Sequence, residues 1–282
     1  MKYNWNERKL EKLLEKDEKL NNKKYSDGLQ LEINSLRLAL NMPVVTNVYS
    51  RGKNYGSGIT YSASSYIFSG GKKDFNIDKR KPLSETEIVH QAKMAMDPKM
   101  KIYFNHMVSH KRFKLGGEAS QTFPLIYHHN SLVSVTNRSA LSDSRNIMHE
   151  LAHAMYFDKL DSDELKNVSK SCLRETLPIF NEMLFIDRLD NYVDIVNEQK
   201  IFLKNFYGFT DSWDFRIYGQ SFTLAEYLFM LYRSDKPKFD HLYNMFKEIL
   251  KTDTDIEIVD KLGVDSNELM AANYKYLELY KR

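Results

Sequence analysis

Residues 146–157 read NIMHELAHAMYF, and this stretch decides both the fold and the chemistry expected of the chain. His149 and His153 are four residues apart, so on a helix both imidazoles project from one face, about one turn apart. That spacing places two nitrogen ligands within reach of one tetrahedral metal ion. Glu150, next to the first histidine, is positioned to take a proton from a metal-activated water. The stretch therefore predicts a metal-binding helix with one zinc ion as its cofactor.

The residues around these three polar side chains are uncharged, as expected of a buried helix. They are Met148, Leu151, Ala152, Ala154 and Met155. The alternative is an ordinary core helix that happens to carry two histidines and a glutamate. That alternative is costly, because burying these polar groups without a metal or other partners costs several kcal/mol.

A two-histidine zinc site needs a third protein ligand and leaves a fourth position for water. Residues 174–185 read RETLPIFNEMLF, and Glu175 follows His149 by 26 residues, which leaves room for a second helix to return. Glu182 lies seven residues beyond Glu175, close to two helical turns, so the two carboxylates share a face. One can bind zinc while the other orients a ligand histidine from behind.

Composition excludes several classes of protein and partner. The chain of 282 residues has a net charge of +3, from 41 basic and 38 acidic side chains. These charges interleave and form no basic stripe, so no nucleic-acid partner is expected. A single cysteine excludes an internal disulfide framework. The N-terminus carries no long apolar run, so we expect neither a signal peptide nor a membrane partner, and a cytoplasmic location.

Apolar spacing and turn residues predict the order of elements along the chain. We expect helices over 5–41 with a break at Asp27-Gly28, two or three short strands over 44–75, a helix from Ser84 to about 114 with an interruption at Asp97-Pro98, two strands over 122–136 joined at His129-Asn130, and helices from 142 onward with breaks near Asp161, Gly208, Pro237 and Gly263.

Four blocks resemble the zinc oligopeptidases that include thimet oligopeptidase and oligoendopeptidase F. They are HELAHAM (149–155), ETLPIFNE (175–182), KLGGEASQTFPLIYHHNSLVSV (114–135) and KLGVDSNELMAANYKYLELY (261–280). The blocks occur in the order of that family, and the resemblance extends from about Phe75 to the C-terminus. The metal block is the most specific of the four.

The resemblance implies Glu175 as the zinc ligand and Glu182 as the second glutamate of the same segment. It further implies a mainly helical, zincin-type metallopeptidase core with a small β-sheet beside the metal-binding helix. We expect residues 1–74 to form an N-terminal helical and β-rich extension and residues 75–282 to form the catalytic domain, the whole being one compact unit. His128 and His129, on the hairpin before the metal helix, become candidates for substrate binding.

The chain departs from the family pattern at several positions. Ala152 replaces a glycine, and Tyr156 stands where the family has a further histidine. In the late stretch WDFRIYGQSFTLAEYLFMLY (213–232), Tyr218 is present but Gln220 replaces a second tyrosine. Tyr218 or the Gln220 amide is therefore the candidate for stabilising the tetrahedral intermediate. Only about 74 residues precede the resembling part of this sequence, where the family has a large helical N-terminal lobe, so we expect either a more open cleft or one that a second copy of the chain completes.

Three functions fit these residues. The first is a zinc-dependent endopeptidase that hydrolyses oligopeptides or unfolded segments, with Glu150 as general base. The alternative is a catalytically degenerate relative that binds peptides or a partner protein and keeps zinc as a structural ion. The third is a regulatory protease with one specific protein substrate. The intact Glu150 favours catalysis, since a purely structural zinc site has no use for a base.

Overall fold

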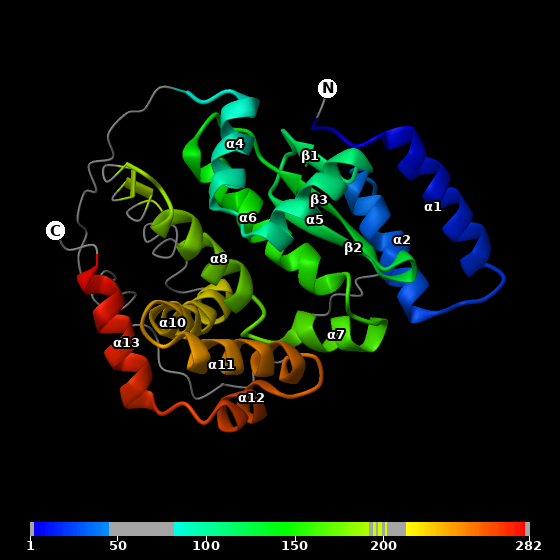
Figure 1. The fold of residues 1–282 in the computed structure, drawn as a ribbon. Coiled ribbons are helices and arrows are strands. Elements are labelled where there is room, and N and C mark those ends of the chain that lie inside the picture. The colour runs from blue at the N-terminus through cyan, green and yellow to red at the C-terminus, as the bar shows by residue number, and fades with distance from the viewer. Residues whose placement is uncertain are drawn as a thin grey trace. The chain divides into compact units, whose positions relative to one another are not determined.

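The computed structural model describes residues 3–44, 82–191, 194, 195, 197, 198, 201 and 213–279. Eleven α-helices and one three-stranded mixed sheet are found among these residues (Figure 1), so the expectation of a mainly helical chain with a small sheet is confirmed. Three predictions lie outside the described residues: the strands expected over 44–75, the break near Gly208 and the domain boundary after residue 74. Of the first stretch, only Val44 is described.

The chain divides into two compact units. The first holds the described residues up to 44 and from Pro82 to Lys166, and the second holds those from Asn167 onward. The first unit contains α1 (Glu7–Asn21), α2 (Asp27–Ala39), α4 (Glu85–Ala95), α5 (Pro98–Ser109), β1 (Phe113–Leu115), β2 (Gln121–Leu125), the 3-10 helix η1 (Ile126–His128), β3 (Asn130–Val135) and α6 (Leu141–Phe157).

The sheet of the first unit has β3 in its centre. β1 pairs with β3 in parallel and β2 pairs with β3 in antiparallel orientation. Successive side chains of a strand point to opposite faces, and β2 shows the consequence. Phe123 joins a core cluster with residues of α1 and α2, while its neighbour Thr122 contacts α6. Helices therefore cover both faces of the sheet, which explains why five of the six residues of β3 are buried.

Local signals account for most helix ends in this unit. Ser84 and Glu87 form the predicted capping box at the start of α4, and α5 begins at Pro98 after the Asp97 cap. The helix expected to reach about residue 114 is shorter than predicted, because α5 ends at Ser109 and residues 113–115 form β1. Pairing with β3 buries Phe113 and Leu115 on a sheet, and this tertiary gain decides the conformation of a three-residue segment.

The second unit is helical throughout its described residues. It contains the last four residues of α7 (Ser162–Lys170), then α8 (Thr176–Asp187), α10 (Trp213–Ser234), α11 (Lys236–Ile249), α12 (Asp255–Leu262) and α13 (Ser266–Glu278). α8 is buried from Thr176 to Ile186, as expected of a helix that is apolar on all sides. It packs against α10, which in turn packs against α11 and α13. Gly263, in the left-handed conformation, ends α12 at the predicted break.

Candidate metal centre

Helix α6, which carries the predicted metal motif, is fixed by an acidic side chain near each end. Asp143 is fully buried and accepts hydrogen bonds from the backbone N–H groups of Arg138 (2.8 Å) and Ala140 (3.0 Å). Asp158 accepts hydrogen bonds from the hydroxyls of Tyr103 and Ser131, both at 2.6 Å. Burial raises the pKa of the Asp158 carboxyl, although both hydroxyls oppose that shift. These contacts fix the rotation of the helix and so the direction of its side chains.

The two histidines of α6 lie on one face, as their spacing predicts. Their ring centroids are 5.0 Å apart, with an angle of 72° between the ring planes. The ring of His153 also stacks on Phe157, one turn further along, at 5.2 Å. The stacking restricts the rotation of the His153 ring, which helps to keep a ring nitrogen directed toward a common point with His149.

The expected base, Glu150, is nearly buried, with 6% of its surface exposed. The hydroxyl of Thr122 on β2 lies 2.8 Å from Glu150 Oε2 and 2.9 Å from the Glu150 backbone carbonyl oxygen. A single hydroxyl hydrogen can be donated to either acceptor or shared between them. Thr122 therefore ties both the side chain and the backbone of Glu150 to the edge strand of the sheet.

Glu175 stands at the start of α8, at the end of a tightly held turn. Asp255 accepts hydrogen bonds from the Ser171 hydroxyl and from the backbone N–H of Cys172 (2.9 Å). The Ser221 hydroxyl of α10 donates to the backbone carbonyl of Cys172 at 2.9 Å. The Glu175 carboxylate is buried, and the guanidinium Nε of Arg174 lies 3.3 Å from its Oε1. The position of Glu175 is thus set by the backbone that precedes it.

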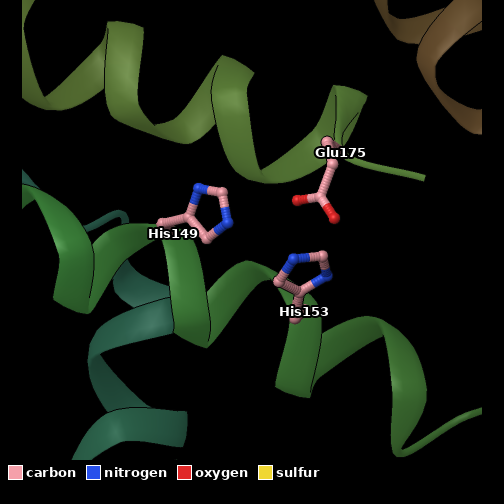
Figure 2. A group of neighbouring side chains, drawn as sticks. All are labelled: His149, His153 and Glu175. Carbon is pink, nitrogen blue, oxygen red and sulfur yellow. The ribbon is translucent and has the colours of Figure 1, made fainter. Parts of the chain in front are cut away.

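Figure 2 shows the carboxylate of Glu175 and the rings of His149 and His153 directed toward one another. Each of the three residues offers one ligand atom, and these atoms all lie within 4.8 Å of one another. His149 is partly buried and Glu175 is buried. Two imidazole nitrogens and one carboxylate oxygen form a donor set that zinc accepts in a tetrahedral site with one position remaining for water or substrate. The cluster can therefore hold a metal ion.

Other residues expected at the site have known positions, but their roles stay predictions. Glu182 is buried on α8, and Tyr218 and Gln220 lie on α10, the first partly exposed and the second 8% exposed. Among the described residues, Gln220 Oε1 is buried with no hydrogen-bond partner. The amide nitrogen of the same side chain is a donor, so it is the atom that could stand in for a tyrosine hydroxyl.

The two histidines of the hairpin lie in different surroundings. His129 is exposed and adopts a left-handed conformation with φ of 48°. His128 Nε2 lies 3.1 Å from Glu32 Oε1 and 3.7 Å from Asp17 Oδ1. Sequence reasoning missed these two acids, just as it missed Thr122. The sequence feature that could have revealed Asp17 and Glu32 was their helical spacing from the leucines on the apolar faces of α1 and α2.

Comparison with protein-family models, with curated proteins and with solved structures finds no match to this chain. Within the part of the chain that the structure describes, no helix is both long enough and apolar enough to cross a membrane.

Proposed function

We propose that this chain is a zinc-dependent endopeptidase in which His149, His153 and Glu175 bind the metal and Glu150 is the general base. The observation that carries the proposal is the convergence of the three ligand atoms within 4.8 Å of one another. Glu150 lies between the two histidines in the sequence of the same helix, so a carboxylate that can act as a base is next to the metal ligands. A structural zinc site, by contrast, is commonly closed by four protein ligands.

The chemistry divides between the ion and the chain. A bound zinc ion supplies Lewis-acid chemistry, which polarises the scissile carbonyl and lowers the pKa of a water molecule. Glu150 accepts the proton of the attacking water at its carboxylate and later gives this proton to the leaving amine. Thr122 fixes the carboxylate of Glu150 through its hydroxyl, 2.8 Å from Oε2. A base that is held in place loses less entropy when the transition state forms.

The sequence resemblance to the oligoendopeptidase F and thimet oligopeptidase family supports the same assignment. Under this proposal Glu175 is the family's zinc ligand, Glu182 orients a ligand from behind, and Tyr218 stabilises the tetrahedral intermediate. The substrate is a peptide or an unfolded segment, and a second copy of the chain is a candidate for completing the cleft. Gln220 is the position that most weakens the match, since it offers an amide where the family has a tyrosine.

The test combines metal content with peptide hydrolysis. Zinc-loaded protein should cleave a library of internally quenched fluorescent peptides, lose this activity in a chelator and regain it on addition of zinc. Glu150→Gln should retain zinc and lose about 10²–10⁴-fold in rate, the usual contribution of a general base. Glu15→Gln, on the exposed face of α1, is the matched control and should behave as wild type.

The results separate the proposal from its rival. Zinc binding with no hydrolysis of any peptide in the library would favour a binding protein with a structural ion. Equal hydrolysis by wild type and Glu150→Gln would reject Glu150 as the base. Loss of zinc in Glu175→Ala, measured by mass spectrometry, tests the third ligand, and zinc content equal to that of wild type would remove Glu175 from the site. Cleavage of long unfolded chains but not of short peptides would point to a regulatory protease.

A further inference from the structure

A second cluster of potential ligands lies in the first unit. Asp17 on α1, Glu32 on α2 and His128 at the end of η1 each offer one ligand atom, and these atoms lie within 4.8 Å of one another. The three residues are far apart in the sequence, and the packing of α1, α2 and the hairpin brings them together. No residue of this cluster belongs to the group formed by His149, His153 and Glu175.

The two acids occupy positions that the helices direct into the core. On α1, Asp17 follows the buried residues Leu10 and Leu14 at helical spacing, so it continues their apolar stripe. On α2, Glu32 lies between the buried residues Leu29 and Leu36 at the same kind of spacing. The side chain of Asp17 is 1% exposed and that of Glu32 is 0% exposed. Helix geometry therefore removes both carboxylates from water.

The hydrogen bonds that such burial demands are largely missing. Both carboxylate oxygens of Asp17, Oε1 of Glu32 and Nε2 of His128 are buried without a hydrogen-bond partner among the described residues. Glu32 Oε2 does accept the backbone N–H of His128 at 3.2 Å, which fixes the carboxylate and leaves Oε1 facing the other two side chains. Buried carboxylates normally have partners, and an unpaired one costs free energy. Apart from the His128 imidazole, no group that could carry a positive charge is recorded facing the two carboxylates among the described residues.

The separations between the ligand atoms suit a metal ion. Bonds of about 2.0–2.2 Å at tetrahedral or octahedral angles place neighbouring ligand atoms roughly 3.0–3.6 Å apart. His128 Nε2 lies 3.1 Å from Glu32 Oε1 and 3.7 Å from Asp17 Oδ1. One imidazole and two carboxylates suit a divalent transition-metal ion, whose two positive charges would balance the two carboxylates. The side chain of His128 is 28% exposed, while its ligand atom Nε2 is buried.

We propose that Asp17, Glu32 and His128 form a second metal site, which takes a divalent transition-metal ion and ties α1 and α2 to the hairpin of β2 and β3. The site is independent of the proposed peptidase centre. It acts through structure, because the ion would join three elements that otherwise meet through apolar contacts around Trp5, Phe123 and Leu132 and through the hydrogen bond from the His128 backbone N–H to Glu32.

The experiment uses the full chain with the first pair of histidines removed. His149→Ala/His153→Ala protein is stripped with a chelator, desalted and titrated with Co²⁺, which is followed by visible absorption and by mass spectrometry of the metal. We expect it to bind a single Co²⁺ ion per chain. Adding His128→Asn should weaken this binding by more than about 100-fold, since even residues behind a ligand contribute about 10–100-fold.

His129→Asn on the same background is the matched control. His129 is the exposed neighbour of His128, and asparagine tolerates its left-handed backbone. This variant should bind Co²⁺ as its parent does. Asp17→Asn, which is isosteric and removes a buried charge, gives a second measurement that does not depend on the hairpin, and it should also lose the ion.

Two results would overturn the proposal. One is a background protein that binds no Co²⁺ while its circular dichroism is that of a folded chain, which would indicate that the two acids share a proton instead. The other is equal Co²⁺ binding in the His128→Asn and His129→Asn variants. If the background variant does not fold, the test uses wild type and the single variant His128→Asn. Wild type should then bind two ions and His128→Asn one, and equal numbers in both would also overturn the proposal.

Discussion

The buried acid pair makes the stability of the metal-free protein depend on pH in a predictable direction. Burial and the negative charge of Asp17 raise the pKa of Glu32 from 4.5 to about 8. The folded state therefore binds this proton more tightly than the unfolded chain does. The resulting stability is fully present below about pH 4.5 and is lost as the pH rises toward 8.

The magnitude follows from the same pKa. One pKa unit corresponds to about 1.4 kcal/mol, so a pKa of about 8 against 4.5 corresponds to on the order of 5 kcal/mol. A domain has typically about 5–15 kcal/mol of stability in total, so the effect is large. Glu32→Gln removes the titrating group and should remove this part of the pH dependence. Asp17 and His128 face Glu32 in both proteins.

The assay is urea denaturation of wild type, Glu32→Gln and the exposed control Glu15→Gln between pH 5 and pH 8, with chelator present throughout. As the pH rises across this range, we expect the unfolding free energy of wild type to fall by several kcal/mol relative to that of Glu32→Gln. Glu15→Gln should run parallel to wild type. Zinc added at pH 8 should stabilise wild type more than Glu32→Gln, because both proteins keep the group of His149, His153 and Glu175 and only wild type keeps Glu32. Parallel curves for wild type and Glu32→Gln would refute the reasoning.

Three further predictions concern the first metal centre and its supports. Thr122→Val should lower kcat/KM by about 10–100-fold with zinc content unchanged, because a hydrogen bond to a charged group is lost at about 1.5–3 kcal/mol, and Thr122→Ser should restore most of the activity. Asp255→Asn should weaken zinc binding by about tenfold, because residues that orient metal ligands without touching the metal contribute about 10–100-fold to affinity. The affinity is measured by competition with a chelator, and an unchanged value would show that the turn before Glu175 needs no support from Asp255. Asp158→Asn should lower the unfolding free energy by about 1–3 kcal/mol in urea titrations, and a value within error of wild type would contradict the anchoring of α6.

Elements with strong local signals could be predicted from the sequence. The four-residue spacing of His149 and His153 needs only a helix to bring the rings together, and α6 provides it. The capping box of Ser84 and Glu87 and the left-handed end of α12 at Gly263 are likewise local. Glu175 lies further from the motif, and its selection rested on the 26 residues after His149, which leave room for a second helix to return, and then on the resemblance.

Features that depend on contacts between distant segments were missed. β1 has three residues, too few to show an alternating pattern, and its conformation depends on pairing with β3. Thr122 meets Glu150 only because β2 packs against α6. Asp17 lies in a charge-rich stretch that resembles a solvated helix face, and only the packing of α2 and the hairpin against α1 shows that this position is buried.

The buried acids in this chain differ in the hydrogen-bond donors that their carboxylates receive, and their roles are assigned from this difference. Asp143 accepts two backbone N–H groups and Asp255 accepts a backbone N–H and a hydroxyl, so each closes a turn with donors supplied by the chain. Asp17 has no such donor on either oxygen among the described residues, and Glu32 has one on a single oxygen. A carboxylate whose donors are present is stable as an anion without any ion. Asp17 and Glu32 require a proton or a cation, and the imidazole of His128, 3.1 Å from Glu32 Oε1, can supply the nitrogen ligand of such a cation.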